Sequence, residues 1–177
     1  MFSLKKQKGF TLIELLIVVA IIGILAALLI PNAMTALQRA KVRGTQSDIA
    51  QIASWIAEYI TDKSTPFAQT GDVSTAMNTA LVPMYTKTLP TTDQWGTKIK
   101  VYTGTAVNGN YALAGSATDD FLVASYGRGG VVESWTYNAS TPEAGYYSIS
   151  TSADFDKDLI NFNGQFIRGP RSGTAGS

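Results

Sequence analysis

The strongest pattern in the chain is a run of apolar residues near its beginning, from Phe10 to Ile30. The 21 residues of this run include a single charged side chain, Glu14. As a helix the run is roughly 31 Å long at about 1.5 Å per residue, which is enough to cross the hydrocarbon core of a bilayer. The run is apolar on every side, so the helix must be buried in lipid or among other helices. A cleaved secretory signal is disfavoured, because the run exceeds the usual apolar region of about 7–15 residues and contains an acid.

The helical pattern continues beyond Pro31 but becomes amphipathic. Four isoleucines recur at spacings of three and four residues, which places them on one face of a helix: Ile49, Ile52, Ile56 and Ile60. We therefore predict one long helix over residues 10–61, whose second half packs on a globular domain. The segment Ser64-Thr65-Pro66 ends this helix.

From Leu89 onward the sequence changes to short β-type runs separated by glycine and asparagine. The pair Asn163-Gly164 lies between two such runs and predicts a hairpin with a type I′ turn over residues 159–168. A short helix is expected within residues 72–81, and further strands at 98–103, 111–114, 121–125, 131–137 and 146–150. The predicted fold is α+β: a long N-terminal helix, hydrophobic in its first half, packed on a small antiparallel sheet.

This organisation divides the chain into four segments. A short lysine-bearing segment (1–9) precedes the apolar helix (10–31) and its amphipathic continuation (32–63). The remainder (64–177) is expected to form a β-rich globular domain.

The residue composition leaves carboxylate, lysine or hydroxyl chemistry possible, or no chemistry at all. The sequence has no cysteine and no histidine, which removes disulfides, thiolate nucleophiles, imidazole bases and imidazole metal ligands. It contains no glycine-rich phosphate loop with its lysine, so any ATP-driven step must be supplied by a partner. The net charge of +1 comes without a basic patch, and nucleic-acid binding is not expected. We predict a protein that is not an enzyme and requires no cofactor.

Basic residues flank the apolar run on both sides. Three lysines directly precede it, and three basic residues follow at a greater distance: Lys5, Lys6 and Lys8, then Arg39, Lys41 and Arg43. The cytoplasmic flank of a membrane helix usually carries the excess of Lys and Arg. The closer lysines therefore favour a cytoplasmic N-terminus, with the C-terminal part on the opposite side.

Glu14 is the most informative residue of the apolar run. A carboxylate at the bilayer centre costs about 2.5–3.5 kcal/mol, and less near the edge. One interpretation is that Glu14 lies close enough to the boundary to reach the headgroups. The other is that it pairs with a cation inside the membrane or inside a helix bundle.

The hexapeptide Gly9-Phe10-Thr11-Leu12-Ile13-Glu14 resembles the processing motif of type IV pilins, a superfamily that includes the pseudopilins of type II secretion. The resemblance implies that a prepilin peptidase cuts between Gly9 and Phe10, removes the leader peptide 1–9, and leaves a Phe10 amine that becomes N-methylated. It also implies that Glu14 is needed for assembly and pairs with the N-terminal amine of a neighbouring subunit. Cleavage creates this amine four residues from Glu14, and a buried carboxylate needs such a cation.

The same resemblance implies partners and a location. Before assembly the protein would cross the bacterial inner membrane once, with its C-terminal part in the periplasm. Its partners would be the lipid bilayer, the prepilin peptidase and methyltransferase, and an inner-membrane assembly platform with its ATPase. Identical subunits would then form a helical filament, as a periplasmic pseudopilus or a cell-surface pilus.

Two kinds of filament fit this resemblance. A major pseudopilin of type II secretion is slightly preferred, because Asp93-Gln94-Trp95-Gly96 resembles the loop that opens the sheet in major pseudopilins. The lack of cysteine points the same way, since many surface pilins close a C-terminal loop with a disulfide. The alternative is the major pilin of a surface type IV pilus that acts in adhesion, motility or DNA uptake. A remote alternative is a monomeric, membrane-anchored periplasmic domain that keeps its leader.

Three alternating acids, Asp154, Asp156 and Asp158, form the best metal candidate. Calcium takes several hard oxygen ligands, which such a loop can supply. Pseudopilins commonly bind calcium in their C-terminal loops, so the resemblance implies a calcium site here. The other interpretation is a solvated acidic turn before the final hairpin. Arg128 departs from the family pattern, because pseudopilins often have an acid at that position of the site.

Overall fold

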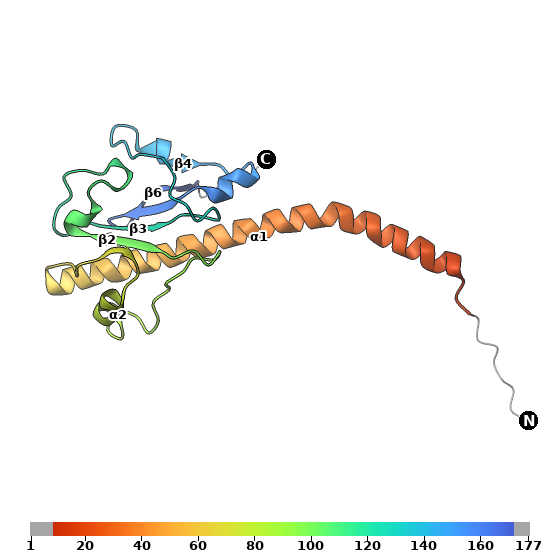
Figure 1. Cartoon of the computed structure of the whole chain (residues 1–177), viewed down its shortest axis with the longest axis horizontal. Helices are drawn as coiled ribbons and strands as arrows, with labels where there is room; N and C mark the ends of the chain where they lie inside the picture. The colour runs from red at the N-terminus through yellow and green to blue at the C-terminus, as the bar shows by residue number, and fades with distance from the viewer. Residues whose placement is uncertain (1–8, 172–177) are drawn as a thin grey trace, which may run out of the picture. The chain divides into compact units, whose positions relative to one another are not determined.

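The computed structural model describes residues 9–171 of the chain (Figure 1). The predicted leader peptide therefore lies outside the described residues, except for Gly9. The two α-helices and six strands are α1 (Leu12–Lys63), β1 (Thr70–Asp72), α2 (Thr75–Leu81), β2 (Lys100–Thr103), β3 (Phe121–Ser125), β4 (Tyr146–Tyr147), β5 (Leu159–Phe162) and β6 (Gln165–Pro170). Four short 3-10 helices lie in the connections: η1 (Gly104–Val107), η2 (Asn110–Ala112), η3 (Pro142–Gly145) and η4 (Ser152–Asp156).

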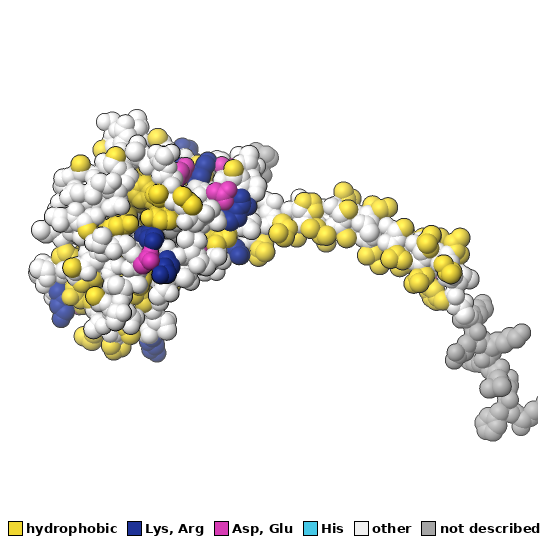
Figure 2. All heavy atoms as spheres, in the orientation of Figure 1, with side chains coloured by type: hydrophobic (Ala, Val, Ile, Leu, Met, Phe, Trp, Pro, Cys, Tyr) yellow, Lys and Arg dark blue, Asp and Glu magenta, His cyan; other side chains and the backbone are white. Residues whose placement is uncertain are grey.

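The chain forms two compact units, and the division between them falls within α1, after Gln38. In the first unit the large apolar side chains of α1 are exposed, and Figure 2 shows them along the visible side of this stretch. Within the described residues, α1 is the one helix that is long and apolar enough to cross a membrane. The prediction of a single long helix that begins in the apolar run is confirmed.

The second unit begins at Arg39 and has a core built on the second half of α1. Ile49, Ile52 and Ile56 are fully buried there, as their helical spacing predicts, and Ile60 at the end of the row is partly buried. This face of α1 packs in one apolar cluster with α2, β2, β3 and β5. The packing of an amphipathic face, rather than helix propensity, is what stabilises this part of α1.

The six strands form one sheet in the order β1-β2-β3-β5-β6-β4. Neighbouring strands run antiparallel, as predicted, except that the two-residue strand β4 lies parallel to β6. The predicted hairpin is confirmed: Asn163 and Gly164 connect β5 and β6 with φ values of 48° and 84°, as a type I′ turn requires. Ser74 caps α2 through its hydroxyl, which accepts a hydrogen bond from the Met77 backbone N–H at 3.3 Å.

Two predicted strands are wrong. Residues 111–114 overlap η2, where Tyr111 and Ala112 have positive φ values that a strand does not allow. Residues 131–137 have no regular structure, although alternate side chains of this segment are partly buried. Trp135 and Tyr137 pack against the second apolar cluster, which contains Leu122 and Ile160. The alternation of apolar and polar residues therefore reflects a segment that packs on the apolar cluster with every second side chain. It does not indicate a strand paired by hydrogen bonds.

Candidate functional site

The predicted processing site lies directly before the first helix. Gly9, Phe10 and Thr11 precede the first residue of α1, Leu12, and the Phe10 side chain is 80% exposed. Gly9 has open space around its α-carbon. The peptide bond between Gly9 and Phe10 is thus outside the helix and accessible to a partner.

Thr11 and Glu14 form a reciprocal cap at the start of α1. The Glu14 Oε2 atom accepts hydrogen bonds from the Thr11 backbone N–H at 2.9 Å and from the Thr11 hydroxyl at 2.6 Å. The Glu14 backbone N–H in turn donates to Thr11 Oγ1 at 3.3 Å. This is a capping box, which satisfies N–H groups that a helix N-terminus otherwise leaves unpaired.

The cap places the Glu14 carboxylate beside the positive end of the helix dipole while the side chain stays exposed. Both side-chain contacts of Glu14 use the same oxygen, so a donor from another molecule can approach Oε1. The part played by Thr11 is not among the sequence predictions above. The spacing Thr-x-x-Glu before an apolar run is the signal that would have indicated it.

A second feature is the loop around Asp93, whose carboxylate organises the entry to β2. Asp93 Oδ1 accepts backbone hydrogen bonds from Trp95 and Thr97, both at 2.9 Å. Its Oδ2 atom accepts a hydrogen bond from the Ser125 hydroxyl at 2.7 Å. Asp93 is buried, and these three bonds compensate for its removal from water.

The residue after Asp93 joins this loop to α1. The Gln94 backbone N–H donates to the hydroxyl of the buried Thr45 at 3.2 Å, and the Gln94 amide donates to Asp48 at 2.9 Å. A side chain at Gly44 would meet Gln94 Cγ at 3.0 Å, so the glycine allows a close approach of the loop to the helix. The tetrapeptide Asp93–Gly96 thus has a structural role in fixing α1 to the sheet.

The three acids of the predicted calcium site do not converge. Asp154 pairs with Lys157 at 2.7 Å, Asp156 pairs with Arg128 at 2.8 Å, and Asp158 points to other partners. The described part of the chain contains no group of three or more acidic, His or Cys side chains placed to hold a metal ion. These residues therefore do not fit a calcium site that all three share.

Asp154 is satisfied by its own turn. Its Oδ2 atom accepts hydrogen bonds from the backbone N–H groups of Thr151 and Ser150, at 2.7 and 3.0 Å, at the start of η4. The Lys157 ammonium, together with these N–H groups, holds the pKa of Asp154 well below its usual range.

Asp158 has a different environment, because its side chain is fully buried. Its Oδ2 atom accepts hydrogen bonds from the Tyr111 hydroxyl at 2.7 Å and from the Glu133 backbone N–H at 3.0 Å. Its Oδ1 atom has no hydrogen-bond partner among the described residues. Burial raises the pKa of Asp158 to about 6, although the two hydrogen bonds act in the opposite direction. Glu133 forms an ion pair with Arg168 at 2.5 Å.

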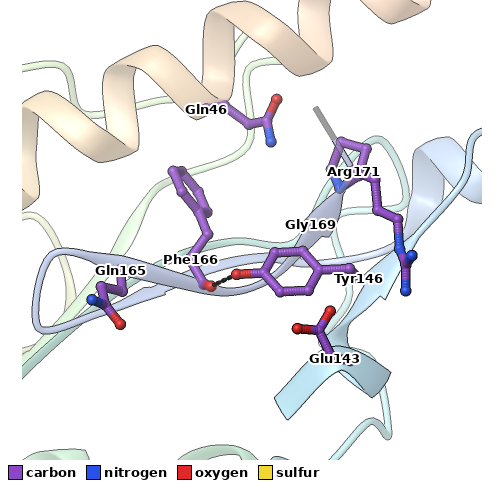
Figure 3. Close-up of a pocket in the computed structure, with 8 residues that line it drawn as sticks. Gln46, Glu143, Tyr146, Gln165, Phe166, Gly169 and Arg171 are labelled. Carbon is purple, nitrogen blue, oxygen red and sulfur yellow. Dashed lines mark hydrogen bonds between the residues drawn. The ribbon is translucent and has the colours of Figure 1, made fainter. Parts of the chain in front are cut away.

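A surface pocket of about 570 Å³ lies between α1 and the end of the sheet (Figure 3). Gln46, Glu143, Tyr146, Phe166 and Arg171 are among its lining residues. Figure 3 shows the Tyr146 hydroxyl directed at the Phe166 carbonyl, to which it donates a hydrogen bond of 2.5 Å. The tyrosine is thereby used to hold β6, and the lining residues contain no paired nucleophile and base.

Comparison with known proteins places these features in a family. The model for the "Prokaryotic N-terminal methylation motif" matches residues 4–30. The type II secretion system core protein G of Escherichia coli K12 is 32% identical over 123 residues, which cover 64% of this chain and 83% of that protein. The chain belongs to the type IV pilin superfamily.

Other members of the superfamily match different shares of the chain. The type IV wide pilus major component PilA4 of Thermus thermophilus is 28% identical over 149 residues, which cover 84% of this chain and 92% of that protein. The core protein G of Pseudomonas aeruginosa is 47% identical over 58 residues, which cover 33% of this chain and 41% of the relative. No solved structure matches the chain significantly. The identity is higher in the short alignment, 47% over 58 residues, than in the longer one, 28% over 149 residues.

Proposed function

We propose that this member of the type IV pilin superfamily is a structural subunit of a helical filament. The observation that supports the proposal most directly is the start of α1. There an accessible Gly9–Phe10 bond, a capped carboxylate at Glu14 and a long exposed apolar surface follow one another. None of these features serves the fold of the second unit, whose core begins with Val42. An apolar surface of this size needs lipid or other helices to cover it.

In the proposed mechanism the protein is first held in the bacterial inner membrane by α1, with its globular unit in the periplasm. A prepilin peptidase then cuts between Gly9 and Phe10, and the new Phe10 amine is methylated. During assembly Glu14 pairs with the N-terminal amine of a neighbouring subunit. This pairing favours one axial register, because a carboxylate left unpaired among apolar helices costs several kcal/mol. An assembly platform and its ATPase supply the energy.

Within this class we prefer a pseudopilin of a type II secretion system. The Asp93 loop with its buried, fully bonded carboxylate supports this choice, as does the relationship to the Escherichia coli core protein G over most of that protein's length. The pilin of a surface type IV pilus is the second candidate. It is favoured by the Thermus thermophilus pilus component, whose similarity covers a larger share of this chain.

The deciding experiment is mass spectrometry of filaments sheared from cells that express the protein at its native level. Abundant protein in the sheared fraction, with a first peptide that starts at methylated Phe10, identifies a surface pilus. The processed peptide in the membrane fraction alone identifies an envelope-confined pseudopilus. An intact leader on a monomeric protein contradicts both candidates and supports a membrane-anchored domain.

A further inference from the structure

The side chain of Arg128 lies at the centre of a set of oxygen atoms contributed by η4. Its Nε and Nη2 atoms donate to the two carboxylate oxygens of Asp156, at 2.8 and 3.0 Å. Nη1 donates to the Ser152 hydroxyl at 3.0 Å, and Nη2 also donates to the Ser152 carbonyl at 2.9 Å. Two carboxylate oxygens, one carbonyl and one hydroxyl are the kinds of ligand that a calcium ion takes. Here they converge on a guanidinium group.

The backbone around Arg128 is shaped for this approach. Gly127 has a φ of 58°, and a Cβ atom at this position would lie 2.6 Å from the Lys157 carbonyl oxygen and 2.9 Å from that of Phe155. The Arg128 backbone N–H donates to the same Phe155 carbonyl at 2.9 Å. Only glycine combines this conformation with this proximity. The turn after β3 therefore brings the backbone of Arg128 into direct contact with η4.

The neighbouring carboxylates have their own internal partners. Lys157 neutralises Asp154, and Arg168 neutralises Glu133. Asp158 is turned inward to Tyr111, away from the ion pair of Asp156. Asp154, Asp156, Asp158 and Glu133 thus each contact a cation or a hydrogen-bond donor that the chain itself provides.

We propose that Arg128 is a built-in cation that orders the C-terminal loop, so that this region folds without a bound divalent ion. A planar guanidinium forms two parallel bonds with a carboxylate and keeps further N–H groups for other acceptors. The single guanidinium group therefore bridges Asp156 and Ser152. A calcium ion, in contrast, needs about six to eight oxygen ligands. In this proposal the Arg128 guanidinium takes the place that a metal ion would have among these oxygen atoms.

The first test is thermal unfolding of the full-length protein in detergent micelles, followed by tryptophan fluorescence. The melting temperature is measured in millimolar EDTA and in millimolar CaCl₂. The two values are expected to agree within about 1 °C, because ligand-linked stabilisation requires binding to the native state. A melting temperature several degrees higher in calcium overturns the proposal.

The second test removes the guanidinium. The variant Arg128→Gln is expected to melt roughly 2–8 °C below the parent protein in EDTA and to be cut faster by protease around residues 126–157. The matched control is Arg43→Gln, which changes an exposed arginine of α1 outside this loop and should leave both readouts unchanged. Equal behaviour of the two variants contradicts the assigned role of Arg128.

Discussion

Asp158, directly before β5, and Asn161, within β5, are buried. Both side chains have polar atoms without hydrogen-bond partners in the described structure. A buried polar group without a hydrogen bond costs free energy that its exposure in the unfolded chain does not. Both residues therefore lower the stability of the globular unit, but only Asp158 does so in a way that depends on pH.

For Asp158 we predict that stability increases as the pH falls. Burial raises its pKa from 3.8 to about 6, so the native state binds the proton more tightly than the unfolded state does. Its contribution is fully present below about pH 4 and is lost as the pH rises to 6, by up to about 3 kcal/mol. The charged groups near it, Glu133 and Arg168, form a pair with each other. Urea unfolding of Asp158→Asn should show a smaller loss of stability than the parent between pH 4 and pH 6.5. Identical slopes for the two proteins would show that burial of Asp158 has no such effect.

For Asn161 we predict a stabilising substitution. Both atoms of its amide group are buried without partners, so Asn161→Leu removes a desolvation cost and keeps a similar volume. The free energy of unfolding should rise by about 1–3 kcal/mol in urea denaturation.

The matched control for this prediction is Asn163→Leu in the adjoining turn. Asn163 accepts a hydrogen bond from the Phe121 backbone N–H at 2.9 Å, donates to Asp120 at 2.7 Å, and has a φ of 48°. This variant should be destabilised, because it loses both bonds and places a branched side chain in a left-handed conformation. Destabilisation of both variants alike would contradict the reasoning about Asn161.

At the scale of elements, the connection between α1 and the sheet depends on the Asp93 loop. Three hydrogen bonds end on this one buried carboxylate, and the next residue bonds to Thr45 and Asp48 of the helix. The loop thereby couples the position of β2 to the position of α1. Interactions of this kind add rigidity that apolar packing alone does not give.

We therefore predict that Asp93→Ala lowers the free energy of unfolding by about 2–4 kcal/mol, because it leaves the Trp95 and Thr97 N–H groups and the Ser125 hydroxyl without an acceptor. Gln94→Ala should have a clearly smaller effect, since its side-chain bond to Asp48 lies at the surface. Urea denaturation of the two variants at pH 7 measures the difference. A larger loss for Gln94→Ala would contradict the central role of the carboxylate.

The elements that the sequence predicts well are those whose signal is local. The apolar run, the isoleucine row of α1 and the Asn163-Gly164 turn each follow from spacings within a few residues. Residues 131–137 were misassigned because alternation reports which side chains are buried, not which backbone groups are paired.

The candidate sites differ in the same way. A processing motif is a contiguous peptide, so the proposed roles of Gly9, Phe10 and Glu14 follow from the sequence alone. A metal site needs atoms that converge in space, and the spacing of three aspartates cannot show that. Nor can this spacing show that Arg128, which lies far from Asp156 in the sequence, forms an ion pair with it.

At the scale of the whole molecule, the apolar part of α1 and the globular unit have separate tasks in the proposed assembly. The first is covered by lipid or by other subunits, and the second is stable through its own core. A change in the first should therefore affect assembly without affecting the fold of the second.

We predict that Glu14→Val gives a stable but unassembled membrane protein. The variant removes the carboxylate that pairs with the neighbouring amine in the proposed mechanism and leaves the core of the second unit untouched. Filaments should be absent by electron microscopy, while the melting temperature of the globular unit stays within about 1 °C of the parent value.

The control for this prediction is Glu58→Val, which removes an exposed carboxylate from the other end of the same helix. Filaments should form normally from this protein. Normal filaments from Glu14→Val as well would overturn the pairing mechanism.

The buried row of Ile49, Ile52 and Ile56 also decides how a soluble fragment can be prepared for crystallography or immunisation. A fragment that starts where the helix ends, at residue 64, would lack these side chains and expose the apolar face of the sheet that they cover. A fragment that starts at Arg39 retains the whole core and omits the exposed apolar part of α1. The part of α1 before Arg39 can thus be removed, whereas any fragment that folds must include the part of α1 that follows.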